Sequence, residues 1–88
     1  MFRKRIVFKG WVQGVGFRYI ASHAARMYGA TGWVRNDLSG TVTMEIQGTQ
    51  GQIDQVITTI KRGHFISIDS MDVTDLAINE EERGFRVM

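Results

Sequence analysis

Hydrophobic and polar residues alternate most regularly from Thr41 to Gln47, where every second residue is apolar. This period of two predicts a strand with one face buried and the other face polar. A turn sequence, Asp37–Gly40, precedes it, so the segment Thr31–Asn36 is expected to pair with it as the first strand of a hairpin. Arg3–Val12 is predicted to form an earlier strand.

Two further segments have the period of an amphipathic helix. From Phe17 to Tyr28, apolar residues recur at i, i+4, i+7 and i+8, and Gly29 follows as a C-terminal stop. The second helix has apolar residues at i, i+3, i+4 and i+7 and is expected to be capped by Gly63. The predicted buried stripes are Ile20, Ala24, Met27 and Tyr28 in the first helix, and Ile53, Val56, Ile57 and Ile60 in the second.

The rest of the chain adds two strands, from about Phe65 to Leu76 and from Phe85 to Val87. Apolar residues change parity along the longer strand, which predicts a bulge or a break near Asp69–Ser70. The order βαββαβ plus a terminal strand indicates an α/β (α+β) sandwich of the ferredoxin-like type, with two helices on one face of an antiparallel sheet. Because the 88 residues contain no linker or repeat, residues 1–88 are expected to form a single domain.

Composition matters mainly through what it excludes. The chain has no cysteine, which excludes disulfides, thiolate metal sites and a cysteine-based phosphatase. No apolar run approaches the roughly 20 residues of a membrane span, and no signal peptide is evident, so a cytoplasmic protein is expected. The net charge of +2 suggests a mild preference for anions but is too small to indicate nucleic acid. The charged clusters Arg3–Arg5 and Glu80–Glu82 are expected to be solvated.

The candidate chemistry lies in the loop Gly10–Arg18, between the first strand and the first helix. Glycines at positions 10, 14 and 16 permit sharp turns and a close approach of the backbone to a ligand. Successive N–H groups and the positive end of the following helix can bind an anion, and Arg18 adds a charged fork that fits phosphate oxygens. The loop alone leaves two interpretations open, a phosphate site and a tight strand-to-helix turn. It matches neither the Walker motif nor the dinucleotide fingerprint.

The chain closely resembles the acylphosphatase family in two segments: Val12–Arg18, which reads Val-Gln-Gly-Val-Gly-Phe-Arg, and Gly32–Asn36 followed by Gly40–Val42. The resemblance covers nearly the whole chain. It implies hydrolysis of the carboxyl–phosphate bond of a small-molecule acyl phosphate to a carboxylate and inorganic phosphate, without a metal or an organic cofactor. It also implies Arg18 and Asn36 as catalytic residues, with Asn36 positioning water, and a phosphate cradle of Gln13, Gly14, Val15, Gly16, Phe17 and Arg18.

The implied reaction agrees with the residues present. The leaving carboxylate has a pKa of about 4 to 5, so it departs without a proton and needs no general acid. Phosphoryl transfer depends on positioning and on stabilising charge, which Arg18 and the loop N–H groups would supply. Asn36 would accept a hydrogen bond from the attacking water, and the substrate phosphate would take the proton because an amide is not a base. Asp37, beside Asn36, is expected to weaken binding of an anionic substrate.

Two other functional classes share features with this sequence. A non-catalytic regulatory module that binds a small anion would use the same loop, so this alternative stays open. RNA-recognition domains share the βαββαβ order but carry stacking aromatic residues on the third strand. The segment Thr41–Gln47 has no aromatic residue and has Glu45 at its centre, which argues against nucleic acid. We expect a monomer with no nucleic-acid or membrane partner.

Other candidate side chains are interpreted as structural. His23 lies roughly 140° around the helix from Arg18, so it is not expected to share the phosphate, and His64 is expected to be solvated or partly packed. Trp11 and Trp33 could stack on a substrate, but packing in the core or at its rim is the favoured interpretation. The segment Gly63–Phe65 lacks the prolines often seen in acylphosphatases. The aspartates match no calcium-loop spacing, so no metal site is expected; they are Asp37, Asp69, Asp72 and Asp75.

Overall fold

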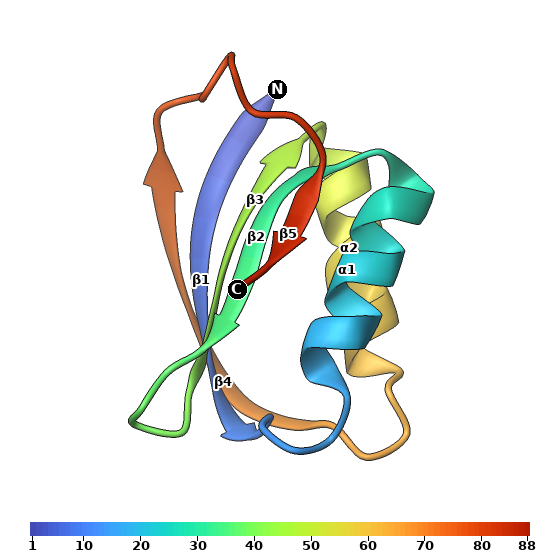
Figure 1. Ribbon diagram of the computed structural model, residues 1–88, viewed down its shortest axis with the longest axis vertical. Helices are drawn as coiled ribbons and strands as arrows, with labels where there is room; N and C mark the ends of the chain where they lie inside the picture. The colour runs from blue at the N-terminus through green and yellow to red at the C-terminus, as the bar shows by residue number, and fades with distance from the viewer.

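Seven helices and strands follow one another in the computed structural model, which describes residues 1–88. They are β1 (Phe2–Trp11), α1 (Phe17–Tyr28), β2 (Thr31–Asn36), β3 (Val42–Gly48), α2 (Gln50–Lys61), β4 (Ser67–Leu76) and β5 (Phe85–Val87). The strands form one five-stranded sheet in the order β4-β1-β3-β2-β5. Both helices lie against the same face of this sheet (Figure 1). The predicted βαββαβ sandwich with a terminal strand is therefore confirmed.

One edge of the sheet departs from a purely antiparallel arrangement. β1 pairs antiparallel with β3 and β4, and β2 pairs antiparallel with β3. β5 instead runs parallel to β2, with Phe85 opposite Gly32. Arg26 of α1 donates from Nη2 to the Phe85 carbonyl oxygen at 3.1 Å. The last strand therefore makes the sheet mixed and is tied to the first helix.

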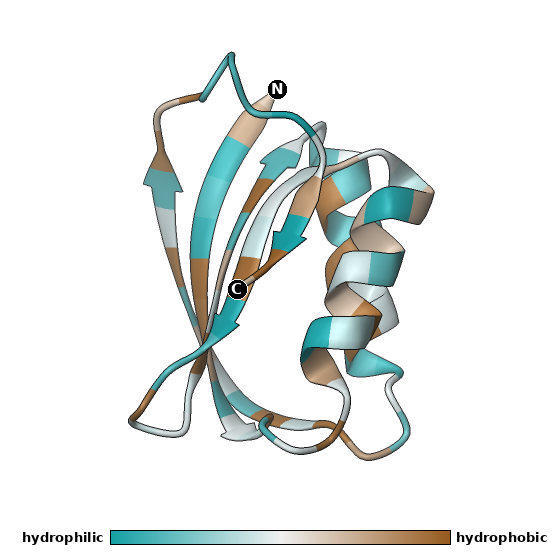
Figure 2. Cartoon of the chain, viewed as in Figure 1, coloured by the Kyte–Doolittle hydropathy of each residue, from teal (hydrophilic) through white to brown (hydrophobic).

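The core lies between the sheet and the helices. Ile6 and Phe8 of β1 are completely buried while Val7 is half-buried, as the alternation of side chains along a strand requires. Apolar and polar residues alternate along the strands in Figure 2. The ring of Phe8 meets that of Phe17 edge-on, with the centroids 4.8 Å apart. Because Phe17 is the first residue of α1, this contact fixes the start of the helix against the sheet.

The buried stripe of α1 differs from the predicted one. Met27 is 62% exposed, so its prediction as a core residue is wrong, and Ile20 is only half-buried. The buried arc is centred on Phe17, Ala21 and Ala24, at i, i+4 and i+7. At 3.6 residues per turn, Met27 lies roughly 80° to one side of this arc. The large side chain at that position therefore points past the edge of the core.

The predicted irregularity in β4 is confirmed as a bulge. Lys9 pairs with Ser70 and Gly10 pairs with Ile68, which leaves Asp69 as the extra residue. Because the bulge resets the parity, Ile68 and Met71 both pack against the core. A Cβ on Gly10 would lie 2.3 Å from the Ser67 carbonyl oxygen, and its φ is 131°. The close approach of β1 and β4 at this point therefore requires glycine.

The expectation that the basic cluster near the start of the chain is solvated is wrong for Arg3. Its side chain is 6% exposed and donates to Glu45 Oε1 from Nη2 at 3.0 Å and to Glu82 Oε1 from Nη1 at 2.8 Å. The connection between β4 and β5 folds back over this end of the sheet, where the Asn79 N–H donates to Gln47 Oε1 at 2.8 Å. A contact between such distant segments leaves no periodic signal in the sequence.

α2 is capped at both ends. Thr49 Oγ1 accepts from the Gln52 N–H at 3.1 Å, and Gln52 Oε1 accepts from the Thr49 N–H at 2.8 Å, a complete capping box. Its C-cap is Arg62 in the right-handed conformation, so the prediction of a Gly63 cap is wrong. Gly63 is instead a packing position, because a Cβ there would lie 2.6 Å from Ile66 Cδ1. Neither α2 nor α1 is long and apolar enough to cross a membrane.

Candidate active site

The loop between β1 and α1 turns through two glycines in the left-handed conformation, Gly14 with φ 72° and Gly16 with φ 80°. A Cβ at either position would meet nothing within 4 Å, so the backbone conformation, and not lack of space, favours glycine here. Gly16 is the N-cap of α1, and its carbonyl oxygen accepts the first helical bond from the Ile20 N–H at 3.0 Å. The helix α1 therefore begins directly after the last glycine of the loop.

The N-terminus of α1 is chemically open, in contrast to that of α2. Gly16 has no side chain to cap the helix, and the first turn contains no acidic residue. The N–H groups at the start of a helix have no partner within the helix, and their dipoles sum to a partial positive charge. Arg18 in the same turn adds a full positive charge. This end of α1 therefore has several donors and no acidic side chain in its first turn.

Arg18 and Asn36 line the same hollow at this helix end. Its volume is about 200 Å³. Arg18 stands in the first turn of α1, and Asn36 is the last residue of β2, so the fold brings together the two residues that the sequence analysis singled out as catalytic. The lining residues are Val12, Gly14, Gly16, Phe17, Arg18, Tyr19 and Asn36. Gln13 and Val15, the other members of the predicted cradle, do not line this hollow. Val12 and Tyr19 do line it, although the sequence did not indicate them as members of the site.

Arg18 is held beside the end of the chain. Its Nη1 donates to the backbone oxygen of Met88 at 3.1 Å, and the Met88 N–H donates to the Val34 carbonyl oxygen of β2 at 2.8 Å. A guanidinium has five N–H donors, so this bond leaves others available to a ligand. The contact orients Arg18 between α1 and β2.

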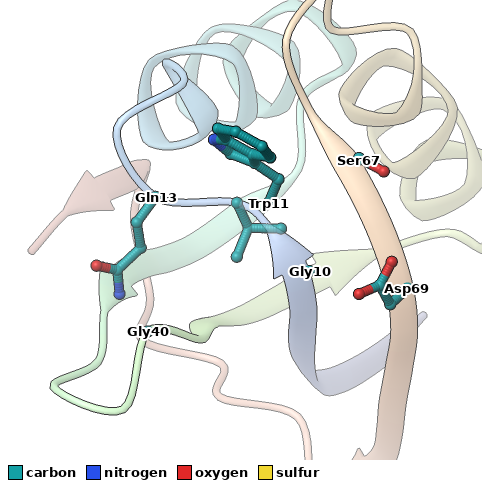
Figure 3. Close-up of a pocket in the computed structure, with 7 residues that line it drawn as sticks. Gly10, Trp11, Gln13, Gly40, Ser67 and Asp69 are labelled. Atoms are coloured by element: carbon teal, nitrogen blue, oxygen red, sulfur yellow. The ribbon is translucent and has the colours of Figure 1, made fainter.

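Gln13 connects the loop to the β2–β3 hairpin through its side chain. Its Nε2 donates to the carbonyl oxygens of Asp37, at 2.7 Å, and Thr41, at 2.9 Å. In Figure 3 the amide of Gln13 points toward the hairpin segment that carries Gly40. Any part of Gln13 in anion binding therefore falls to its backbone N–H. The side chain instead links the glycine loop to the turn that follows Asn36.

The carboxylate of Asp37 is directed into that turn. Oδ2 accepts from the hydroxyls of Thr43 at 2.7 Å and Thr41 at 2.8 Å, and Oδ1 accepts from Arg35 Nε at 3.0 Å. Burial raises the pKa of Asp37, but the hydrogen bonds from Thr43, Thr41 and Arg35 outweigh it, and the pKa lies below the usual value. The negative charge that the sequence places beside Asn36 is thus compensated within the hairpin.

The two histidines lie outside this hollow. The ring of His23 stacks on that of Tyr19 with the centroids 6.0 Å apart, and the ring of His64 meets that of Phe65 edge-on at 4.7 Å. No group of three or more His, Asp or Glu side chains is placed to hold a metal ion. Trp11, interpreted from the sequence as a packing residue, is 72% exposed. The exposure of this aromatic residue is a feature of the fold that no pattern in the sequence predicts.

Comparison with known proteins identifies what the chain is similar to. The family model described as Acylphosphatase matches residues 4–87. An acylphosphatase from Geobacillus kaustophilus is 38% identical over 89 residues, which cover 100% of this chain and 95% of the relative. The crystal structure of acylphosphatase from Bacillus subtilis is similar with a TM-score of 0.91 and 30% identity, covering 100% of this chain and 99% of that one. A crystal structure of full-length HypF in a phosphate- and nucleotide-bound form is similar with a TM-score of 0.87 and 30% identity, covering 99% of this chain and 12% of HypF.

Proposed function

This chain belongs to the acylphosphatase family and is a hydrolase of acyl phosphates, and we propose that the hollow between Arg18 and Asn36 is its active site. Family membership decides for an enzyme and against the non-catalytic anion-binding module. The reaction cleaves the carboxyl–phosphate bond and releases a carboxylate and inorganic phosphate. The roles of the individual residues are what we propose here.

The phosphate group binds at the open N-terminus of α1. The observation that carries this assignment is the contrast between the two helix N-termini, because α2 has a complete capping box whereas no side chain caps α1. Backbone N–H groups of Gln13 to Phe17 donate to the phosphate oxygens, and the helix dipole favours their negative charge. Arg18 adds charge-assisted hydrogen bonds to the same oxygens. The charge on the equatorial oxygens is thereby stabilised through the transition state.

Asn36 positions the attacking water. It is exposed at the end of β2 and lines the same hollow as Arg18, so its side-chain oxygen can accept a hydrogen bond from a water next to the phosphorus. Because the bound water is already held in line, little further entropy is lost when it attacks the phosphorus. Because an amide is not a base, the proton passes to an oxygen of the phosphate itself.

The leaving group needs no proton donor. A carboxylate with a pKa of about 4 to 5 is a stable anion at neutral pH. Neither histidine lines the hollow. Substitution of His23 by Gln is therefore expected to leave the hydrolysis rate unchanged.

The test is phosphate release from benzoyl phosphate in the presence of a chelator. Arg18→Ala and Asn36→Ala should each lower kcat by a factor of about 10² or more, the order seen when one transition-state donor is removed. Arg62→Ala removes an exposed arginine at the end of α2 and is the matched control. Circular dichroism verifies that each variant is folded. Full activity in a folded Asn36→Ala variant would remove Asn36 from the mechanism, and full activity in Arg18→Ala would remove Arg18.

We also propose that the protein is a cytoplasmic monomer whose partner is a small-molecule substrate, with neither nucleic acid nor a membrane involved. On β3, the polar residues Thr43, Glu45 and Gln47 are buried, so this strand offers no open surface for stacking bases. Analytical ultracentrifugation tests the oligomeric state. A species larger than one chain across a range of concentrations would refute the monomer.

A further inference from the structure

A second hollow adjoins the one assigned to the phosphate. Its volume is about 440 Å³, and it is lined by Trp11, Gly14, Val15 and Phe65. Gly14 lines both hollows, so the two are separated only by the turn of the glycine loop. Apart from Gly14, all of its lining residues have apolar side chains, whereas the phosphate hollow contains Arg18 and Asn36.

The aromatic side chains of this second hollow are exposed to water. Trp11 and Phe65 are each 72% exposed, although burial of such rings is favourable. Pairing of Trp11 with Ser67 in the β1–β4 ladder brings the two aromatic residues to the same end of the sheet. The ring of His64 packs edge-on against the ring of Phe65. Large apolar groups that converge on one hollow next to an active site indicate a binding surface for an apolar group.

We propose that this hollow binds the acyl group of the substrate and makes the enzyme selective for aromatic and other bulky apolar acyl phosphates. The inference rests on the proposed function, since it takes the phosphate to lie between Arg18 and Asn36. In an acyl phosphate the phosphorus and the acyl carbon share one bridging oxygen. The acyl group must therefore lie in a space that adjoins the phosphate, and the Trp11–Phe65 hollow does so at Gly14.

The only other hollow next to the loop suits an apolar acyl group less well. It has a volume of about 480 Å³ and lies on the other side of Trp11. Figure 3 shows Asp69, the bulged residue of β4, and Ser67 along one wall, with Gln13 on the opposite side. The carboxylate of Asp69 would repel an anionic acyl phosphate that approached through this space. Trp11 lines both hollows, and only the one of about 480 Å³ contains a carboxylate.

Selectivity is tested by comparing two substrates that differ in the acyl group. Benzoyl phosphate has a ring that reaches the aromatic side chains, whereas the methyl group of acetyl phosphate is too small to contact both. Trp11→Ala should lower kcat/KM for benzoyl phosphate about tenfold, as loss of a ring-to-ring contact and of apolar burial predicts. The value for acetyl phosphate should stay within about twofold. Phe65→Ala should act in the same direction as Trp11→Ala, and Trp11→Phe should keep the selectivity. The control is Met27→Ala, which removes an exposed apolar side chain on α1 and should leave kcat/KM unchanged for both substrates.

Binding of two inert analogues separates failure of this inference from failure of the proposed function. Benzylphosphonate should bind more tightly than methylphosphonate, and Trp11→Ala should abolish the difference, whether or not the protein turns over. A wild type that binds both phosphonates but hydrolyses neither acyl phosphate would refute the proposed function alone. An unchanged benzoyl-to-acetyl ratio in folded Trp11→Ala and Phe65→Ala variants would overturn the acyl-group site. The acyl-group site would also be overturned if the wild type were a dimer and Trp11→Ala dissociated it without changing the selectivity. In that case Trp11 and Phe65 would contact a second copy of the chain.

Discussion

Replacing Asp37 by Asn tests how the hairpin supports the active site. The substitution keeps the size of the side chain and removes its charge. One amide oxygen can still accept from the Thr41 and Thr43 hydroxyls, which now meet Oδ2 at 2.8 and 2.7 Å, but these bonds lose their ionic character. The amide nitrogen then faces Arg35 Nε, which now lies 3.0 Å from Oδ1, and the ion pair is lost.

The expected loss of stability follows from these contacts. Each threonine bond becomes weaker by about 0.5 to 1 kcal/mol on passing from a charged to a neutral acceptor. The pair with the half-exposed Arg35 contributes about 0.5 kcal/mol. Asp37→Asn should therefore lower the free energy of unfolding by about 2 kcal/mol, which for a chain of this length lowers Tm by about 8 to 16 °C. The matched control is Asp72→Asn, because Asp72 meets only Lys9, at 3.6 Å on the surface, and should shift Tm by less than about 4 °C.

The pH dependence gives an independent check on this reasoning. The pKa of Asp37 is lower in the folded protein than its usual value of 3.8, so its contribution is fully present above that value. The contribution is lost as the pH falls through the lowered pKa, because a protonated carboxyl resembles the amide. The difference in stability between wild type and variant, followed by thermal unfolding in circular dichroism, should thus shrink in acid. A variant as stable as the wild type at neutral pH, or one that binds benzoyl phosphate more tightly, would refute the conclusion that the charge is compensated within the hairpin.

Three further predictions concern the fold around the site. Thr49→Ala removes the α2 cap and should cost about 1 kcal/mol in urea denaturation while leaving phosphate release unchanged; a loss of activity would contradict the separation of the two helix ends. Gly32→Ala would place a Cβ 1.9 Å from the Glu45 carbonyl oxygen at a φ of 143°, so the soluble folded yield should collapse, and a stable variant would disprove this packing. Burial raises the pKa of Glu45, but the hydrogen bonds from Arg5 and Arg3 outweigh this effect, and the pKa lies below its usual value of 4.5. Glu45 therefore stabilises the fold fully above pH 4.5, and this stability is lost as the pH falls through the lowered pKa. Arg3→Met should therefore flatten the acid limb of the stability curve, and an unchanged limb would argue against the pairing.

The elements of this fold were predictable because their signals are local. Alternation and 3.6-residue periods gave the strands and both helices, and the change of parity near Asp69 gave the bulge. Boundaries shifted by a few residues at most, as in β4, which begins at Ser67 instead of Phe65. The parallel pairing of β5 with β2 could not be predicted, because nothing in three residues records which strand they will join.

Much of the candidate site was predictable from sequence motifs, because Gly14, Gly16 and Phe17 line the hollow together with Arg18 and Asn36. Arg18 and Asn36 stand in recognisable motifs, and the fold brings them to one hollow. The role of Gln13 as a link to the hairpin depends on carbonyl oxygens whose positions follow from the folded turn. The burial of Arg3 and the meeting of Trp11 with Phe65 depend on segments that are distant in sequence. Such contacts arise from tertiary packing, which overrides the usual expectation that an arginine near a strand end is solvated.

The central claim is that the open N-terminus of α1 and Arg18 bind the phosphate group. Titration of the ¹⁵N-labelled protein with inorganic phosphate, followed by backbone amide resonances, tests it most directly. Saturable shifts should be largest at the amides of residues 13 to 19 and should require a much higher phosphate concentration in Arg18→Ala. Shifts centred elsewhere, for example around Arg83 and Arg86, or an affinity unaffected by Arg18→Ala, would contradict it.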